Sequence, residues 1–319
     1  MNAPDRAAPT AGQGAASNAV PFIVMLITPL FFSSNLIFGR LVIPEVAPFT
    51  LAFLRWGLAA LALLPWVLAS RTAALAWIRH STWLWLVLGF LGMWICGGVV
   101  YFALGLTSAT NGTLIYTTSP LIILIIERLF YGRTVSWREF AGILIGFSGV
   151  AIIVLRGDLL VLLAMRFNIG DLMFVGAAIA WALYSVLLRS RPSEGLDNLA
   201  FFGLSASAGA LLLAPVALAE FLLGEPMPVT TQAWTGIGGI VLLSSLLAFG
   251  GFQYGISRLG AATASIFMYL MPPYGVGLAV IVLGEPFQSY HAIGIATVLT
   301  GLVMATLKSP LRKRAPVAN

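Results

Sequence analysis

Ten long apolar runs constrain the fold of this chain more than any other feature of its sequence. A run of about 18 or more apolar residues is typical of a membrane-spanning helix, because roughly 20 helical residues cross the hydrocarbon of a bilayer. The sequence lacks the alternation of a transmembrane β-barrel. We therefore predict an all-α integral membrane protein with ten transmembrane helices. The runs lie near residues 20–40, 47–69, 81–105, 107–130, 136–155, 169–189, 197–222, 233–257, 259–283 and 288–307.

The composition excludes a soluble protein. Hydrophobic residues make up 60% of the 319 residues and charged residues only 9%, whereas a soluble domain carries about 25% charged residues. Cys96 is the only cysteine, so an intramolecular disulfide is impossible. The sequence contains no phosphate-binding loop, and we expect no ATP, no other cofactor, no metal and no nucleic acid to take part.

Lysine and arginine are distributed unevenly between the predicted loops, and this bias predicts the orientation. With the N-terminus inside, the cytoplasmic segments contain thirteen of these residues and the external segments three. We expect an inner-membrane protein with both termini in the cytoplasm, and the net charge of +6 needs no nucleic acid to explain it. Residues 1–18 are expected to form a disordered cytoplasmic tail, 157–168 an external linker and 308–319 a basic cytoplasmic tail.

The sequence repeats itself at an offset of 152 positions. Pairs of glycines and prolines carry this match, since chance matches of leucine and alanine are frequent in so apolar a chain. A looser match at an offset of 150 places Pro65 on Pro215. The repeats are predicted at 19–156 and 169–307, and because each holds five helices, the second is inverted in the membrane. The matched pairs are Pro120 with Pro272, Gly132 with Gly284, Gly142 with Gly294, and Gly149 with Gly301.

Two phrases of the sequence resemble a known family. These are the "GEP" turn at 284–286 before a glycine-spaced last helix, and "GDLMFVGAAIAWALYSVLLRS" at 170–190. With the 5+5 repeat, they look like the EamA-type drug/metabolite transporter (DMT) superfamily, and within it the YddG-type exporters of aromatic and other neutral amino acids. The resemblance implies a secondary transporter of small metabolites. The chain departs from the pattern at Arg133, where the turn more often carries glutamate.

The substrate site is predicted where equivalent helix faces meet at the middle of the membrane. Thr113, Thr117 and Pro120 share one face of the fourth helix, and their repeat partners share one face of the ninth. At 1.5 Å per residue, these residues lie roughly 15 Å from their helix starts. The first and sixth helices contribute a second pair of faces. The predicted substrate-binding residues are Trp181, Tyr269, Thr117, Thr113, Ser265, Asn35, Phe31, Tyr184, Ser185, Pro120 and Pro272.

Other polar residues have more than one interpretation. Tyr101 and Gln253 correspond under the repeat and lie near opposite faces of the membrane, which suits outer and inner gates. Arg55 lies roughly 12 Å inside the second helix, and is either a functional charge or a side chain that reaches the interface or bonds to carbonyl groups. Asp171 is expected to cap a helix. The stripe of Gly142, Gly146 and Gly149 predicts close helix packing.

No Asp or Glu lies near the middle of any predicted helix, so a buried proton relay has no obvious carrier. We predict alternating-access export of neutral or zwitterionic metabolites, amino acids with aromatic or apolar side chains above all, by facilitated downhill flux. A drug or toxic-compound exporter of the same fold is the alternative. A lipid scramblase or scaffold remains open, as does a rhomboid-like intramembrane serine protease that uses Ser148 and His291.

Overall fold

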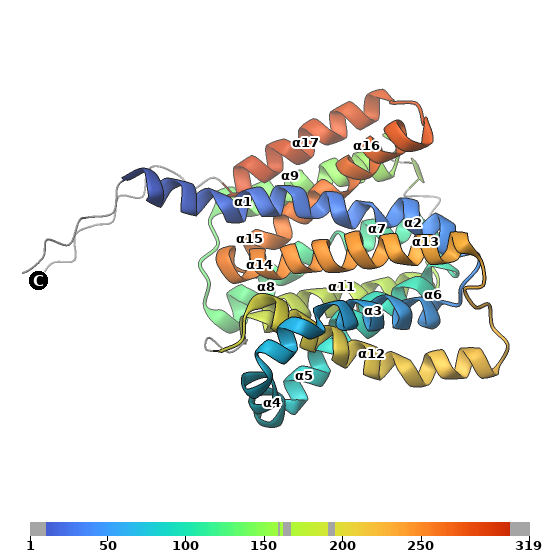
Figure 1. The fold of residues 1–319 in the computed structure, drawn as a ribbon. Coiled ribbons are helices and arrows are strands. Elements are labelled where there is room, and N and C mark those ends of the chain that lie inside the picture. The colour runs from blue at the N-terminus through green and yellow to red at the C-terminus, as the bar shows by residue number, and fades with distance from the viewer. Residues whose placement is uncertain (1–10, 159, 162–166, 191–194, 307–319) are drawn as a thin grey trace, which may run out of the picture.

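The computed structural model describes residues 11–158, 160–161, 167–190 and 195–306, and within these ranges the chain is helical and contains no strand. Ten helical segments are long and apolar enough to cross a membrane, and they lie side by side as one bundle (Figure 1). The prediction of a ten-helix membrane protein is confirmed. The segments are Ala19–Gly39, Pro48–Ala69, Thr82–Leu104, Ala109–Tyr131, Trp137–Val154, Ile169–Leu187, Asn198–Leu222, Thr231–Leu259, Ala261–Val282 and Ser289–Thr306.

Several spans consist of more than one helix. In the first half, the elements are α1 (Ala11–Ser33), α2 (Asn35–Val42), α3 (Pro48–Ala69), α4 (Arg71–His80), α5 (Thr82–Gly89), the π-helical segment Phe90–Val99, α6 (Val100–Leu104), α7 (Ala109–Tyr116), α8 (Ser119–Tyr131) and α9 (Trp137–Val154). In the second half, they are α11 (Ile169–Leu187), α12 (Asn198–Leu222), α13 (Thr231–Gly239), the π-helical segment Ile240–Leu247, α14 (Ala248–Leu259), α15 (Ala261–Ile266), the 3-10 turn Phe267–Leu270, α16 (Met271–Leu283) and α17 (Ser289–Thr306).

Both described ends of the chain lie at the same end of the bundle, because ten spans return the chain to its starting side (Figure 1). We call this side, which also holds α4 and the turn 132–136, the terminal end. The other side, which holds the turns 105–108 and 284–288, is the opposite end.

The backbone confirms the inverted repeat. The fourth span is interrupted between α7 and α8, just before Pro120, and the ninth is interrupted between α15 and α16, just before Pro272. Both spans then end on a left-handed glycine, Gly132 with φ 62° and Gly284 with φ 68°, a conformation that glycine adopts at little cost. After these glycines, the next amide donates at 3.2 Å to the carbonyl of Glu127 in one copy and of Ala279 in the other.

Glycines bring α9 and α17, which are equivalent in the two halves, into backbone contact. A Cβ on Gly142 would lie 2.6 Å from the amide nitrogen of Ala305, and one on Gly301 would lie 2.3 Å from that of Gly146. Gly149 meets Val298 in the same way, at 2.6 Å. The predicted role of these glycines in close helix packing is confirmed.

The equivalent helices α3 and α12 also pack together. Glu220, near the end of α12, accepts hydrogen bonds from the backbone amides of Phe49 and Thr50 at 3.1 and 2.6 Å, and from the Thr50 hydroxyl at 2.8 Å. A carboxylate at a helix N-terminus satisfies free amides and stabilises the helix dipole. This contact fixes the start of α3, the helix that carries Arg55.

Two local features differ from the sequence prediction. Helix α1 begins at Ala11, so residues 11–18 of the predicted disordered tail are helical, because alanine favours the helix strongly. The segment 71–80, expected as a loop, forms α4. Residues 1–10 and the basic tail 308–319 lie outside the described residues, as do 159 and 162–166 of the predicted linker 157–168.

The inverted topology predicts sided labelling of the two equivalent turns. Thr134 and Pro286 are both exposed. In a Cys96→Ala background, Thr134→Cys and Pro286→Cys should react with a membrane-impermeant maleimide from opposite sides, with position 134 facing the cytoplasm. Labelling of both positions from one side of sealed vesicles would contradict the predicted membrane orientation of the halves.

Candidate functional site

A central cavity of about 370 Å³ lies between the two halves. It extends from the level of Trp181 and Met268 to Ala109, the exposed first residue of α7, and so reaches the opposite end. Of the predicted substrate-binding residues, seven line it, together with Arg55. These are Asn35, Thr113, Thr117, Pro120, Trp181, Tyr269 and Pro272.

The two interrupted spans supply polar groups to the cavity. Proline cannot donate a backbone hydrogen bond, so neither Pro120 nor Pro272 bonds to the carbonyl four residues before it. The Met268 carbonyl accepts from the Met271 amide in a 3-10 turn instead. The Thr117 hydroxyl donates to the Leu114 carbonyl at 2.9 Å, and the Ser33 hydroxyl lies 2.8 Å from the Met271 carbonyl. Irregular backbone at this depth is tolerated where it lines a cavity.

Aromatic rings form the floor of the cavity. Trp181 on α11 is 5% exposed and stacks on Phe252 at a centroid distance of 4.9 Å. The edges of Phe249 and Phe32 meet it at 5.4 and 6.1 Å. Trp181 therefore packs in an aromatic cluster and also presents a surface to the cavity.

Tyr269 brings an unpaired hydroxyl to the same cavity. The residue is 1% exposed, and its hydroxyl oxygen has no hydrogen-bond partner. Its ring lies against Gly146, where a Cβ would come within 2.7 Å of Cδ2. A buried hydroxyl without a partner is costly, so this group is available to a bound molecule.

Arg55 lies in the cavity wall and is 5% exposed. Its Nε donates to Ser245 Oγ at 2.7 Å, its Nη1 to the Tyr101 hydroxyl at 2.9 Å and its Nη2 to the Ser244 carbonyl at 2.9 Å. The guanidinium therefore points inward and does not reach for the interface. The structure thus excludes a side chain that reaches the interface, whereas the predicted bond to a carbonyl group is present at Ser244.

The remaining predicted binding residues lie behind the cavity wall. Ser185 donates to the Trp181 carbonyl at 2.7 Å, and Ser265 donates to the Ala262 carbonyl at 2.9 Å. Tyr184 accepts a hydrogen bond from Gln253 Nε2 at 2.8 Å, and Phe31 presents its carbonyl to Ser34 at 2.7 Å. These residues support the wall and do not form its surface.

The two predicted gate residues are both buried and hydrogen-bonded. Tyr101 on α6 holds Arg55 and lies 3.5 Å from Asn35 Oδ1. Gln253 on α14 holds Tyr184, whose ring packs against Trp181 at 5.7 Å. Tyr101 therefore contacts two residues of the cavity wall, Arg55 and Asn35, whereas Gln253 reaches the wall through Tyr184. Asp171 caps α11 in a reciprocal box with Asn168, as expected.

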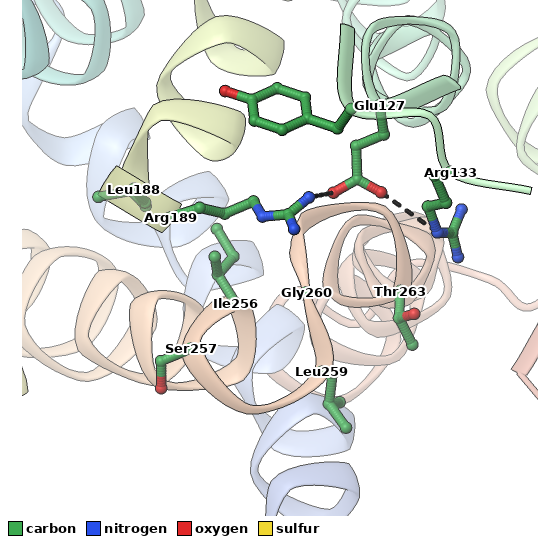
Figure 2. A pocket seen from close by; sticks show the side chains of 10 residues that line it. Glu127, Arg133, Leu188, Arg189, Ile256, Ser257, Leu259, Gly260 and Thr263 are labelled. Carbon is green, nitrogen blue, oxygen red and sulfur yellow. Dashed lines mark hydrogen bonds and ion pairs between the residues drawn. The ribbon is translucent and has the colours of Figure 1, made fainter. Parts of the chain in front are cut away.

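A cluster of charges joins the two halves at the terminal end (Figure 2). Glu127 on α8 is 2% exposed; its Oε2 lies 3.3 Å from Arg133 Nε, and its Oε1 lies 3.2 Å from Nη1 of Arg189, just after α11. Arg133 also pairs with Glu139 at 2.6 Å. Glu127, Arg133 and Arg189 line a second cavity of about 570 Å³ with residues of α14 and α15.

The sequence shows no acid near the middle of a predicted helix, and for that reason the burial of Glu127 was not predicted. Its place is near a helix end, yet it is buried, because the left-handed turn at Gly132 brings Arg133 back over α8. The available signal was Arg133 itself. An arginine where the other copy has Glu285 indicates a nearby carboxylate partner.

The residues proposed for a serine protease are engaged elsewhere. The Ser148 hydroxyl donates to the Ile145 carbonyl at 2.8 Å, and His291 Nδ1 accepts from the Gln288 amide at 3.1 Å. A nucleophile and its base need a hydrogen bond to each other. No such bond joins these two residues in the described part of the chain.

The chain matches the EamA-like transporter family twice, over residues 20–155 and 168–307. It therefore belongs to this family, and the two matched segments coincide with the two halves of the fold. A protein of known crystal structure is similar with a TM-score of 0.72 and 21% identity, over 90% of this chain and 97% of that one, which supports the fold.

Curated relatives are also described as transporters. An uncharacterized transporter of Archaeoglobus fulgidus is 28% identical over 91% of this chain and 99% of its own length. The uncharacterized transporter YyaM of Bacillus subtilis is 24% identical over 89% and 93%. A probable terminal-alkyne amino-acid exporter of Streptantibioticus cattleyicolor is 24% identical over 65% of this chain and 67% of the relative.

The charge cluster predicts how easily a thiol reagent reaches Cys96 from the terminal side. Cys96 is the single native cysteine and lines the central cavity. Glu127→Gln removes the charge that holds Arg189 across the halves. An ion pair with a half-exposed partner contributes about 0.2–1 kcal/mol, so thiosulfonate labelling of Cys96 from the terminal side should rise by a factor of about 1.4 to 5.

Glu139→Gln is the matched control for this experiment. Glu139 pairs with Arg133 inside the same half, so its loss should leave labelling from the terminal side unchanged. An equal rise in both variants, or none in Glu127→Gln, would show that the ion pair between the halves does not hold this end closed.

Proposed function

We propose that this member of the EamA-like transporter family exports neutral or zwitterionic amino acids with aromatic or apolar side chains. The central cavity is the observation that supports this. Its volume of about 370 Å³ lies within the range of roughly 300–1,000 Å³ typical of small-molecule sites. Trp181, Phe249 and Tyr116 offer flat apolar surfaces, and Thr113, Asn35 and Tyr269 offer hydrogen bonds.

The relative described as an amino-acid exporter favours this substrate class. It matches across two thirds of the chain, which is more than one repeat and so includes residues from both walls of the cavity. A drug exporter of the same fold remains the second candidate, since an aromatic lining also suits apolar cations.

We propose alternating access by rocking of the two halves. The central cavity reaches the opposite end, whereas the pair of Glu127 and Arg189 and the stack of Trp181 on Phe252 close the terminal side. With both termini in the cytoplasm, this arrangement faces outward, the state from which an exported solute leaves. The reverse state requires Glu127 and Arg189 to separate.

Energy coupling is proposed to be absent, so that the substrate gradient alone drives export. None of the described residues lining the central cavity is Asp, Glu or His, and proton relays in membranes are built from these side chains. Glu127 and Asp171 lie at helix ends.

Flux into proteoliposomes tests the function directly. Radiolabelled phenylalanine, leucine and tryptophan should move down their gradients, and an uncoupler that collapses the proton gradient should change the rate by less than about twofold, because no charge relay is involved. Transport that stops with the uncoupler would contradict downhill export. Transport of ethidium but of no amino acid would favour the drug exporter.

Trp181→Ala should abolish most transport and affect aromatic substrates more than small ones. Stacking of a ring contributes about 0.5–1.5 kcal/mol beyond area burial, which corresponds to about two- to tenfold in the KM of aromatic substrates relative to alanine. Initial rates with phenylalanine and alanine measure this difference.

Two tryptophans are controls. Trp77 on α4 is as buried as Trp181, 7% against 5% exposed, but packs on Phe201 away from the central cavity. Trp66 is 42% exposed near the terminal end of α3. Trp66→Ala should transport nearly normally, and Trp77→Ala should lower stability without changing the substrate ratio. A similar ratio change in Trp77→Ala would assign the Trp181 effect to packing.

A further inference from the structure

Arg55 gives the central cavity a charge that nothing in the cavity balances. It is the only charged residue among the described residues that line the cavity. It lies seven residues after Pro48, the first residue of α3, which is roughly 10 Å into the helix. No described ion pair involves it.

The groups that hold Arg55 are all neutral. They are the hydroxyls of Ser245 and Tyr101 and the carbonyl of Ser244, and the rings of Trp56 and Phe249 lie 4.7 and 5.5 Å from its Cζ. A guanidinium has five N–H groups. Three are used, so one hydrogen on Nη1 and one on Nη2 remain without an acceptor among the described residues.

This arrangement of a buried guanidinium is energetically unfavourable unless an anion binds to it. A buried charge without a counter-charge is strongly unfavourable, and a charge retained inside a membrane span points to a function. The neutral acceptors fix the guanidinium in place without neutralising it. A planar guanidinium with free hydrogens on both Nη atoms matches a carboxylate, which accepts two parallel hydrogen bonds.

An ammonium group finds no counter-charge. The described cavity lining contains no Asp or Glu, so an ammonium would meet hydroxyls, the Asn35 side chain, carbonyl groups and the faces of aromatic rings, all of them neutral. The apolar body of a ligand has Trp181 and Phe249 to contact, and the free Tyr269 hydroxyl offers one more hydrogen bond. The cavity is therefore built for a carboxylate on an apolar body.

We propose that Arg55 binds the carboxylate of the substrate, and that this carboxylate, not the ammonium group, is what the cavity requires. The substrate class is then monocarboxylates with an aromatic or apolar body, of which amino acids are one subset. The inference rests on the proposed function, since it assigns the chemistry of the same cavity. It extends that function to acids that carry no amino group.

Three compounds that share one ring separate the two charged groups. They are 3-phenylpropionate with the carboxylate alone, phenylalanine with both groups, and phenylalaninamide with the amine alone. Binding to the purified full-length protein is measured by tryptophan fluorescence and thermal shift. We expect both acids to bind and the amide to bind at least about tenfold more weakly, since a hydrogen-bonded charge is lost.

Arg55→Gln keeps hydrogen-bond donors and removes the charge. It should weaken both acids about ten- to hundredfold and leave the weak binding of the amide unchanged. Arg55→Lys should restore part of the affinity, because the charge returns without the planar fork. A purely structural role of Arg55 would instead lower affinity for all three compounds alike.

The outcomes also separate this inference from the proposed function. Amide binding equal to that of the acids, or no binding of 3-phenylpropionate, overturns the inference, and neither result depends on a variant folding. Acids that bind through Arg55 but do not move in proteoliposomes would sink the transport proposal and leave the carboxylate site. Equal flux of the acid and the amide would support transport and overturn the carboxylate site.

Discussion

The need to satisfy backbone groups inside lipid governs this structure. Every peptide group in the bilayer requires a partner, so a helix can be interrupted only where something other than lipid receives its free groups. Of the spans that consist of more than one helix, the fourth and the ninth are interrupted just before a proline, Pro120 and Pro272. These positions are equivalent under the repeat, and both border the central cavity. The cavity is thus where the bundle tolerates irregular backbone, and it is also where polar groups become available to a solute.

The remaining architecture holds the two interruptions opposite each other. Backbone contact at Gly149 and Gly301 joins α9 to α17, and the carboxylate of Glu220 anchors the start of α3 on α12. Both are contacts between helices that are equivalent in the two halves. The halves are therefore connected along their symmetric helix pairs, while the cavity lies between them. This division suits a molecule in which one half rocks against the other.

Much of this could be read from the sequence, because the governing patterns are local. Apolar runs give the spans, and paired glycines and prolines give the repeat, since each glycine or proline has a backbone role that few residues replace. Helical periodicity also placed Thr113, Thr117 and Tyr269 on the cavity. It placed Ser185 and Ser265 there too, although their hydroxyls bond back to their own helices. Rotation about a helix axis is set by neighbours, which a single helix does not reveal. The burial of Glu127 was missed for the same reason, because two other segments create it.

The repeat is symmetric in backbone but not in charge, and this has a kinetic consequence. Glu127 forms an ion pair across the halves, whereas Ala279 occupies the equivalent position and cannot. In the alternating-access cycle proposed above, one of the two conformations would thus receive a stabilisation that its mirror image lacks, and the populations of the empty carrier would be unequal. A carrier that is coupled to no ion cannot shift the equilibrium of a neutral substrate away from equal concentrations on the two sides. The ratio Vmax/KM is therefore equal in both directions. The separate values of KM and Vmax are free to differ. Under the proposed uncoupled cycle, the asymmetry of a single carboxylate would be expressed as different half-saturation on the two sides of the membrane, and added salt, which screens the exposed side of that pair, would bring the two sides closer.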